Sequence, residues 1–129
     1  MKATVLRLYM HESRRFHGML LYEWLLEHAR KLGVHGGSAF RAVAGYGRHG
    51  VMQEQNFFEL AGELPVVTEF VVNEADVERI LAMVRKENID LVYVSWPAEY
   101  SATGASGAAA TPITPIEPIT PSASPGGTS

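Results

Sequence analysis

The order of the predicted secondary-structure elements constrains the fold of this chain more than any other feature. Two segments repeat apolar residues at helical spacing, residues 19–32 and a second run from Asn73 to about Glu87. Short apolar or alternating runs predict strands over residues 3–10, 38–44, 65–72 and 91–96. The order is therefore β-α-β-β-α-β. It predicts a ferredoxin-like α+β fold, in which a four-stranded antiparallel sheet carries both helices on one face.

A single residue predicts the end of the first helix, and another predicts the start of the second. Asn73 is suited to accept a hydrogen bond from the first turn of the second helix, as an N-cap does. Gly33 is suited to the left-handed conformation that commonly ends a helix.

The sheet face opposite the helices needs a cover. Five large aromatic residues lie on the predicted strands, and they are too many to stay in water comfortably: Tyr9, Phe40, Phe70, Tyr93 and Trp96. We therefore expect a homo-oligomer that buries this open face.

Composition excludes several classes of function. The net charge of −3 argues against nucleic-acid binding, which needs a basic face. The absence of cysteine excludes disulfides, thiol catalysis and thiolate metal sites. No apolar run approaches the ~18 residues of a membrane span, and the amino-terminal segment is not of signal-peptide type. We expect a cytoplasmic protein without direct membrane insertion.

The carboxy-terminal segment differs in composition from the rest. From Ser101 onward it holds Ala, Gly, Ser, Thr, Pro and Ile with a single charge, Glu117, and residues 111–121 repeat Thr-Pro-Ile with small changes. Such a segment cannot bury a core. It predicts a folded domain over residues 1–98 and a disordered tail over residues 99–129, which is either a simple appendage or a docking segment for a partner.

The segment between the second and third predicted strands, residues 45–64, is far longer than an ordinary hairpin loop of ~2–5 residues. A loop of this length in a compact domain is usually functional. At its start, Gly45 and Gly47 permit close backbone approach, and Arg48 and His49 supply donors. Together they predict a cradle for a phosphate or carboxylate, although an ordinary turn has the same composition.

A second group of donors precedes the first helix. Ser13, Arg14 and Arg15 lie just before a helix N-terminus, whose free N–H groups favour anions. The alternative is a set of solvated charges. No arrangement of nucleophile and base is recognisable, and we expect no enzymatic activity. The five histidines match no standard zinc spacing.

Three segments resemble the P-II family of signalling proteins. Residues 37–50 resemble the stretch in which P-II members carry Gly-Phe-Gly-Arg-Gln at the start of the flexible T-loop, and residues 64–72 resemble their Leu-Pro-Lys-Val strand. Residues 12–23 resemble Glu-Ser/Asp-x-Arg/Lys-x-x-Gly-x-Pro-Leu-Tyr-Glu, a motif of a P-II-like branch of unknown function. The resemblance covers about residues 2–97.

This resemblance implies a trimer that binds ATP, ADP or AMP between subunits and docks on a membrane transporter or an enzyme through the loop. It places Gly45, Gly47, Arg48 and His49 at the nucleotide-facing base of that loop. Residues 85–90 contain no glycine, where the family has a glycine-rich basic loop, so a different anion or nucleotide stays open. Two other functions stay open as well: a ligand-independent interaction module, and a divalent-metal-binding stress protein, because the related divalent-cation-tolerance proteins share the fold.

Overall fold

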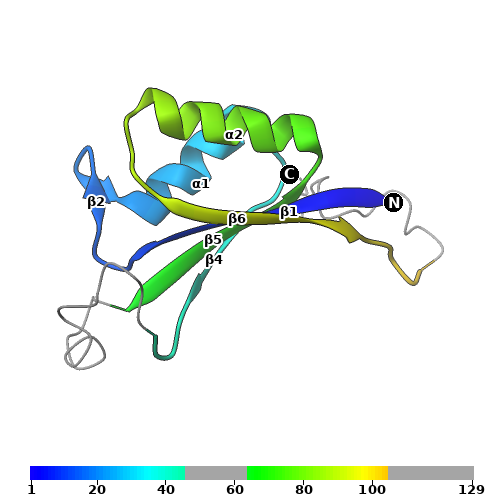
Figure 1. The fold of residues 1–129 in the computed structure, drawn as a ribbon, viewed down its shortest axis with the longest axis horizontal. Helices are drawn as coiled ribbons and strands as arrows, with labels where there is room; N and C mark the ends of the chain where they lie inside the picture. Colours follow the sequence, from blue (N-terminus) through cyan, green and yellow to red (C-terminus); the bar gives the residue numbers. More distant parts are fainter. Residues whose placement is uncertain (46–63, 105–129) are drawn as a thin grey trace, which may run out of the picture.

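The computed structural model describes residues 1–45 and 64–104. The described part forms two layers, a twisted sheet and a pair of helices (Figure 1). Its elements are β1 (Lys2–His11), β2 (Arg15–Phe16), β3 (Met19–Leu20), α1 (Leu21–Lys31), β4 (Ser38–Arg41), β5 (Pro65–Val72), α2 (Glu74–Lys86) and β6 (Val92–Glu99). The main sheet has the order β4-β5-β1-β6 with every neighbour antiparallel. The predicted ferredoxin-like α+β fold is confirmed.

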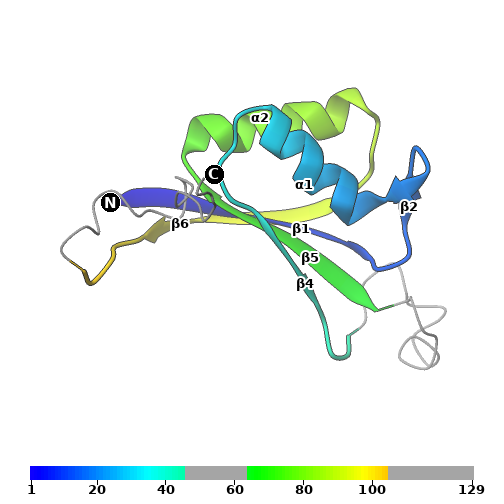
Figure 2. The ribbon, with the colours of Figure 1, turned by 180° about the vertical axis from the view of Figure 1, so that it is seen from behind.

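Both helices cover the same face of the sheet (Figures 1 and 2). Alternate residues of the two central strands point into this layer, because successive side chains of a strand face opposite ways. Facing them are the apolar stripes of the helices, and the fully buried side chains include Leu6, Leu8, Phe70, Leu21, Leu25 and Ile80. None of the helices in residues 1–45 and 64–104 has the length and apolar character needed to cross a membrane.

Each helix ends in a backbone motif that satisfies its last carbonyl groups. Gly33 has a φ of +93°, and the amides of Gly33 and Val34 donate to the carbonyls of Arg30 and Ala29 at 3.0 and 3.1 Å. This is the Schellman arrangement, which confirms the predicted role of Gly33. At the end of α2 the same left-handed position is taken by Asn88, with a φ of +56°.

The predicted start of α2 is also confirmed. The Asn73 side chain accepts a hydrogen bond of 2.7 Å from the Asp76 amide. The Asp76 carboxylate pairs with Arg79 at 2.9 Å, and the Arg79 guanidinium also donates to the Leu32 carbonyl, which joins the two helices.

Several element boundaries differ from the prediction. The first helix begins at Leu21 rather than at Met19, because β3 pairs with β2 in a small hairpin. Residues 11–18, for which no helix or strand was predicted, contain β2 and the hairpin turn, in which His17 and Gly18 have φ values of +51° and +82°. Positive φ at both central residues is the requirement of a two-residue type I′ turn. β2 and β3 could not be predicted, because a strand of two residues is too short to show the alternation of apolar and polar residues.

The outer strands also differ from the prediction. β4 ends at Arg41, three residues before the predicted end at Ala44, and β6 extends three residues beyond the predicted end at Trp96. β6 accommodates Pro97 because it is an edge strand, where a missing N–H can face outward. The strand runs one residue past the predicted domain boundary. Most of the predicted disordered tail, residues 105–129, lies outside the described residues.

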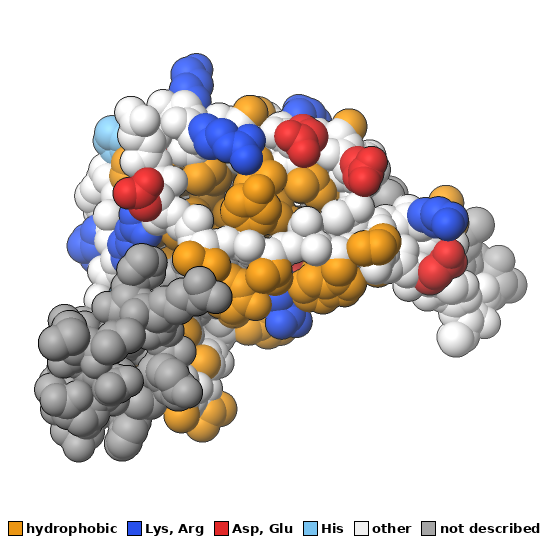
Figure 3. All heavy atoms as spheres, in the orientation of Figure 1, with side chains coloured by type: hydrophobic (Ala, Val, Ile, Leu, Met, Phe, Trp, Pro, Cys, Tyr) orange, Lys and Arg blue, Asp and Glu red, His pale blue; other side chains and the backbone are white. Residues whose placement is uncertain are grey.

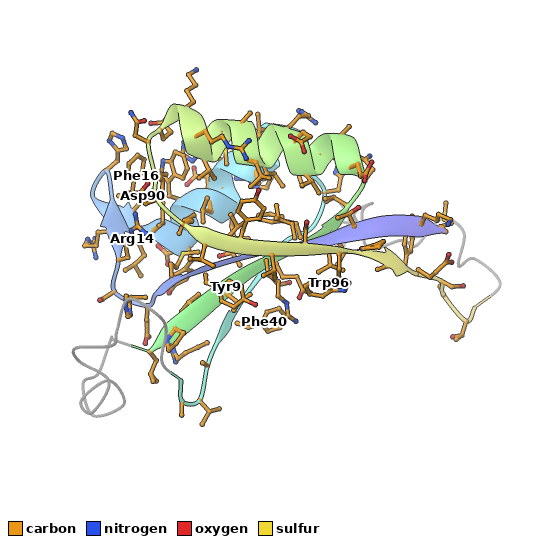
Figure 4. The ribbon with its side chains drawn as sticks, viewed as in Figure 1. Tyr9, Arg14, Phe16, Phe40, Asp90 and Trp96 are labelled. Carbon is orange, nitrogen blue, oxygen red and sulfur yellow. The ribbon has the colours of Figure 1, made fainter. Side chains whose placement is uncertain are left out.

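The sheet face opposite the helices is strongly apolar. Tyr9, Phe40 and Trp96 lie on it as predicted, and all three side chains point away from the helix layer (Figure 4). Phe70 and Tyr93 were placed there wrongly: their cross-strand partners are Leu6 and Leu8, which face the helices. Phe70 is only 1% exposed. On β6 the residues that lie on the open face include Val92 and Val94, both exposed. Figure 3 shows apolar side chains gathered along this side of the molecule.

One ion pair lies within this apolar face. The Arg7 Nε donates to the Glu69 Oε1 at 2.7 Å, and the Arg7 guanidinium lies 5.5 Å from the centre of the Trp96 ring. The hydrogen bond to Glu69 raises the pKa of Arg7 above its usual value. The only two charged residues that β1 and β5 place on this face therefore neutralise each other.

Candidate functional site

The ends of β4 and β5 hold together the base of the long loop. The Ala42 amide donates to the Pro65 carbonyl at 2.8 Å, which extends the pairing of the two strands beyond Arg41. Gly45 lies against Pro65, since a Cβ at Gly45 would be 3.2 Å from the Pro65 Cγ. The predicted site residues Gly47, Arg48 and His49 lie outside the described residues.

Glu12 connects this loop base to the segment that leads into α1. Its amide donates to the Leu64 carbonyl at 2.8 Å, and its carboxylate pairs with the Arg41 guanidinium at 2.6 Å. Glu12 therefore contacts both the strand that enters the loop and the residue that leaves it. The sequence analysis assigned this residue no role of its own. The available signal was its place as the first residue of the motif at residues 12–23.

Arg14 connects the same segment to the turn that follows α2. Its Nη1 donates to the Asp90 carbonyl at 2.6 Å, and its own carbonyl accepts from the Leu21 amide at 2.8 Å. Arg14, Phe16 and Asp90 lie together at one end of the molecule (Figure 4). Three segments that are distant in the sequence thus meet here: the loop base, the hairpin and the connection between α2 and β6.

Arg15 and Ser13 complete the predicted second group of donors. The Arg15 Nη2 donates to the Gly18 carbonyl at 2.8 Å and closes the hairpin turn, whereas Ser13 is exposed. The N-cap residue of α1, Leu20, makes no side-chain capping hydrogen bond. A guanidinium has five N–H donors, so Arg14 and Arg15 each keep donors beyond the one that holds a carbonyl. The structure brings Ser13 and Gly45 to the same end of the sheet, with Glu12, Leu64 and Pro65 between them.

A series of ring contacts fixes the hairpin on α1. Phe16 packs edge-on against Trp24, with 4.9 Å between ring centroids, and Trp24 stacks on His28 at 4.0 Å. His17, in the turn, packs on Phe16 and lies 3.9 Å from the Glu87 carboxylate. In the described part of the chain, no group of three or more His, Asp or Glu side chains is arranged to hold a metal ion.

Solved structures of PII-like proteins share this architecture. A putative PII-like signaling protein from Thermus thermophilus superposes with a TM-score of 0.51 at 18% identity, over 75% of this chain and 86% of the other. CPII from Thiomonas intermedia K12, in a structure bound to ADP, AMP and acetate, gives a TM-score of 0.55 at 14% identity, over 78% of this chain and 90% of CPII. The fold is that of the PII-like proteins.

The sequence comparison identifies the family within that class. The chain belongs to the DUF190 family, described as "Uncharacterized ACR, COG1993", whose model matches residues 3–99. A UPF0166 protein of Aquifex aeolicus (strain VF5) is 32% identical over 101 residues, which cover 72% of this chain and 96% of the relative. The UPF0166 protein of Methanocaldococcus jannaschii is 34% identical over 80 residues, covering 62% of this chain and 73% of the relative. The predicted resemblance to a branch of unknown function that has the P-II-like fold is confirmed.

Proposed function

We propose that this chain is a P-II-like regulatory protein of the cytoplasm rather than an enzyme. It binds a small anionic effector, an adenine nucleotide such as ATP, ADP or AMP, between subunits of a homotrimer. Through the loop over residues 45–64 it then controls a partner protein, either a membrane transporter or an enzyme. The observation that carries this proposal is the junction at one end of the sheet, where Glu12 holds the loop base beside the arginine-bearing hairpin.

The chemistry of the junction suits an anionic ligand. Arg14 and Arg15 lie in adjacent positions, and both have N–H donors left over from their backbone contacts. Hydrogen bonds from a guanidinium to a phosphate or carboxylate are charge-assisted and stronger than neutral ones. CPII, which has the same fold, is known in structures with ADP and AMP, one of which also contains bicarbonate. An adenine nucleotide is therefore the first effector to test.

Control of the loop requires that the ligand bind its two states with different affinity. Glu12 is placed to transmit such a difference, because it contacts Arg41 in the strand before the loop and Leu64 at the end of the loop, and is two residues from Arg14. A ligand that pulls on the Arg14 side chain displaces the backbone to which Glu12 belongs. We propose that Glu12 positions the loop base without touching the ligand.

The open sheet face supports the homo-oligomer. Phe40 and Trp96 are 52% and 41% exposed, and the Arg7–Glu69 pair leaves the centre of the face without net charge. Neighbouring copies of this chain fit such a surface, because apolar contact dominates and no charge is left to oppose the approach.

Limited proteolysis of the loop tests the proposal. ADP and AMP should slow cleavage within residues 46–63 of the wild-type protein, and Glu12→Gln should weaken this protection while ligand affinity changes less than threefold. Lys31→Gln is the matched control, because Lys31 is an exposed cation at the opposite end of α1. Equal cleavage with and without every nucleotide, together with partner binding that needs no ligand, would establish the ligand-independent interaction module instead.

A further inference from the structure

The hairpin formed by β2 and β3 is attached to the rest of the molecule at several points. Phe16 packs edge-on against Trp24 of α1, with 4.9 Å between the ring centroids. The Arg14 guanidinium, directly before β2, donates to the Asp90 carbonyl at 2.6 Å (Figure 4). Neither contact changes with pH near neutrality, because these aromatic rings do not titrate and a guanidinium keeps its proton.

A further contact of the hairpin depends on pH. The His17 Nε2 in the turn lies 3.9 Å from the Glu87 Oε1 at the end of α2. The attraction between them requires a protonated imidazole, and imidazole is the side chain that ordinarily changes charge between pH 5 and 8. The two side chains are 66% and 36% accessible, so solvent screens the pair and limits its effect on an equilibrium to a few fold.

The turn does not itself require a histidine. His17 and Gly18 are the central residues of the type I′ turn, where Asn-Gly is the usual pair. The histidine ring instead has contacts of its own, since it packs edge-on against Phe16 with 4.0 Å between the ring centroids. The Glu87 backbone is fixed as well, because its amide donates to the Met83 carbonyl at 3.2 Å and closes the last turn of α2. Both groups of the ion pair therefore stand on a defined backbone.

The charges around His17 single out Glu87 as its partner. The charged or titratable side chains that accompany these contacts are Arg14 and Arg15 on the hairpin, Glu23 and His28 on α1, Arg85, Lys86 and Glu87 at the end of α2, and Asp90 on the connection to β6. Among these described residues, Glu87 alone forms an ion pair with His17. The carbonyl end of α2 also favours a cation, whereas Arg15 and Lys86 oppose one. His28 is held within α1, since its Nδ1 shares a hydrogen bond of 2.9 Å with the Trp24 carbonyl.

We propose that His17 and Glu87 form a pH-sensitive clasp that positions Arg14 and Arg15. At acidic pH the protonated His17 holds the hairpin on α2, and the two arginines are held in place for an anion. As the pH rises above neutrality the imidazole loses its proton, and the hairpin opens more often. Guanidinium donors that are held in place bind an anion more tightly, because less conformational freedom is lost on binding. This last step rests on the proposed effector site, whereas the clasp itself does not.

Amide hydrogen exchange of the effector-free protein, measured by NMR, tests the clasp first. The protection factor, which removes the intrinsic pH dependence of exchange, should be about two- to fivefold higher for the amides of residues 15–20 at pH 5.5 than at pH 8.0. Glu87→Gln and His17→Asn should abolish this difference, and asparagine keeps the left-handed turn. His35→Gln is the control, because His35 is an exposed histidine outside the hairpin, and it should keep the difference. Equal protection at both pH values in the wild type, or the full difference in Glu87→Gln, would overturn the clasp.

Calorimetry with ADP at the same two pH values tests the positioning step. The ratio of affinities at pH 5.5 and pH 8.0 should be about two- to fivefold larger for the wild type than for Glu87→Gln, and titration of the ADP phosphates cancels in this comparison. Equal ratios in the two proteins would show that the clasp does not act on the arginines and would overturn the positioning step. No binding of ADP to either protein would contradict the effector site and with it the positioning step, while the protection factors would still decide the clasp.

Discussion

Removing Glu69 tests whether a neighbouring copy covers the open sheet face. In a lone chain the Arg7–Glu69 pair is partly exposed, with side chains 39% and 21% accessible. Solvent screening limits the contribution of such a pair to about 1 kcal/mol or less. Under a neighbouring subunit the same pair is buried. Removing one partner then leaves an unpaired charge in an apolar interface, at a cost of about 3–5 kcal/mol.

Glu69→Met separates these two cases because methionine keeps the length of the side chain and removes the charge. We expect the free energy of unfolding to fall by about 3–5 kcal/mol in urea titrations, and the oligomer to dissociate in sedimentation velocity at the same protein concentration. The double variant Arg7→Met with Glu69→Met is the control. It should recover to within about 1 kcal/mol of wild type, because an apolar pair replaces a buried ion pair at little cost. A loss below about 1 kcal/mol in Glu69→Met, with the oligomer intact, would refute burial of this face.

Four further predictions concern single sites. Thr68→Val should raise stability by about 1–2 kcal/mol, because the Thr68 hydroxyl is fully buried and has no hydrogen-bond partner among the described residues, and a loss of stability in urea would show that it has one. Gly37→Ala should lower stability by about 1–3 kcal/mol through the clash with Phe70, and an unchanged melting temperature would contradict the close packing at this site. Truncation after Tyr100 should leave the melting temperature within about 2 °C of wild type, whereas a larger drop would mean that the tail contributes to the fold. Arg48→Ala should weaken nucleotide binding by about tenfold in calorimetry with the oligomer unchanged, and unaltered binding would remove the loop base from the ligand site.

The periodic elements of this fold were predictable because they bury one face. The helical stripe of α2 and the alternation of β5 repeat over 13 and 8 residues, long enough to distinguish their periods. Asn73 and Gly33 were also predictable, because each position needs a property that few other residues have: a side-chain acceptor in one case and a positive φ in the other.

The hairpin was missed for the opposite reason. Each of its strands has two residues, and its turn is specified only by the ability of His17 and Gly18 to adopt positive φ. Because the hairpin was not predicted, the start of α1 was placed at Met19, which belongs to β3, instead of at Leu21. The same limit applies to the two faces of the sheet: Phe70 and Tyr93 are aromatic residues on strands, and only the register of β1 against β5 and β6 shows that they face the helices.

The candidate site was predictable in its residue types but not in its contacts. Arg14 was expected to donate hydrogen bonds to an anionic ligand. Its guanidinium also donates to the backbone carbonyl of Asp90, which lies 76 residues away in the chain. The motif at residues 12–23 marks Glu12 but does not reveal its contacts, because the contacts with Arg41 and Leu64 depend on how β1 and β4 flank β5. Contacts between distant segments follow from topology, and a single sequence does not reveal them.

The most direct test of the proposed regulatory function is titration calorimetry of the full chain with ATP, ADP, AMP, cyclic AMP and bicarbonate, each with and without Mg²⁺. Saturable binding of an adenine nucleotide at one site per protomer is the predicted result, and Arg14→Gln should weaken it. No saturable heat with any of these ligands, in a sample that sedimentation shows to be a folded oligomer, would contradict the effector-binding function.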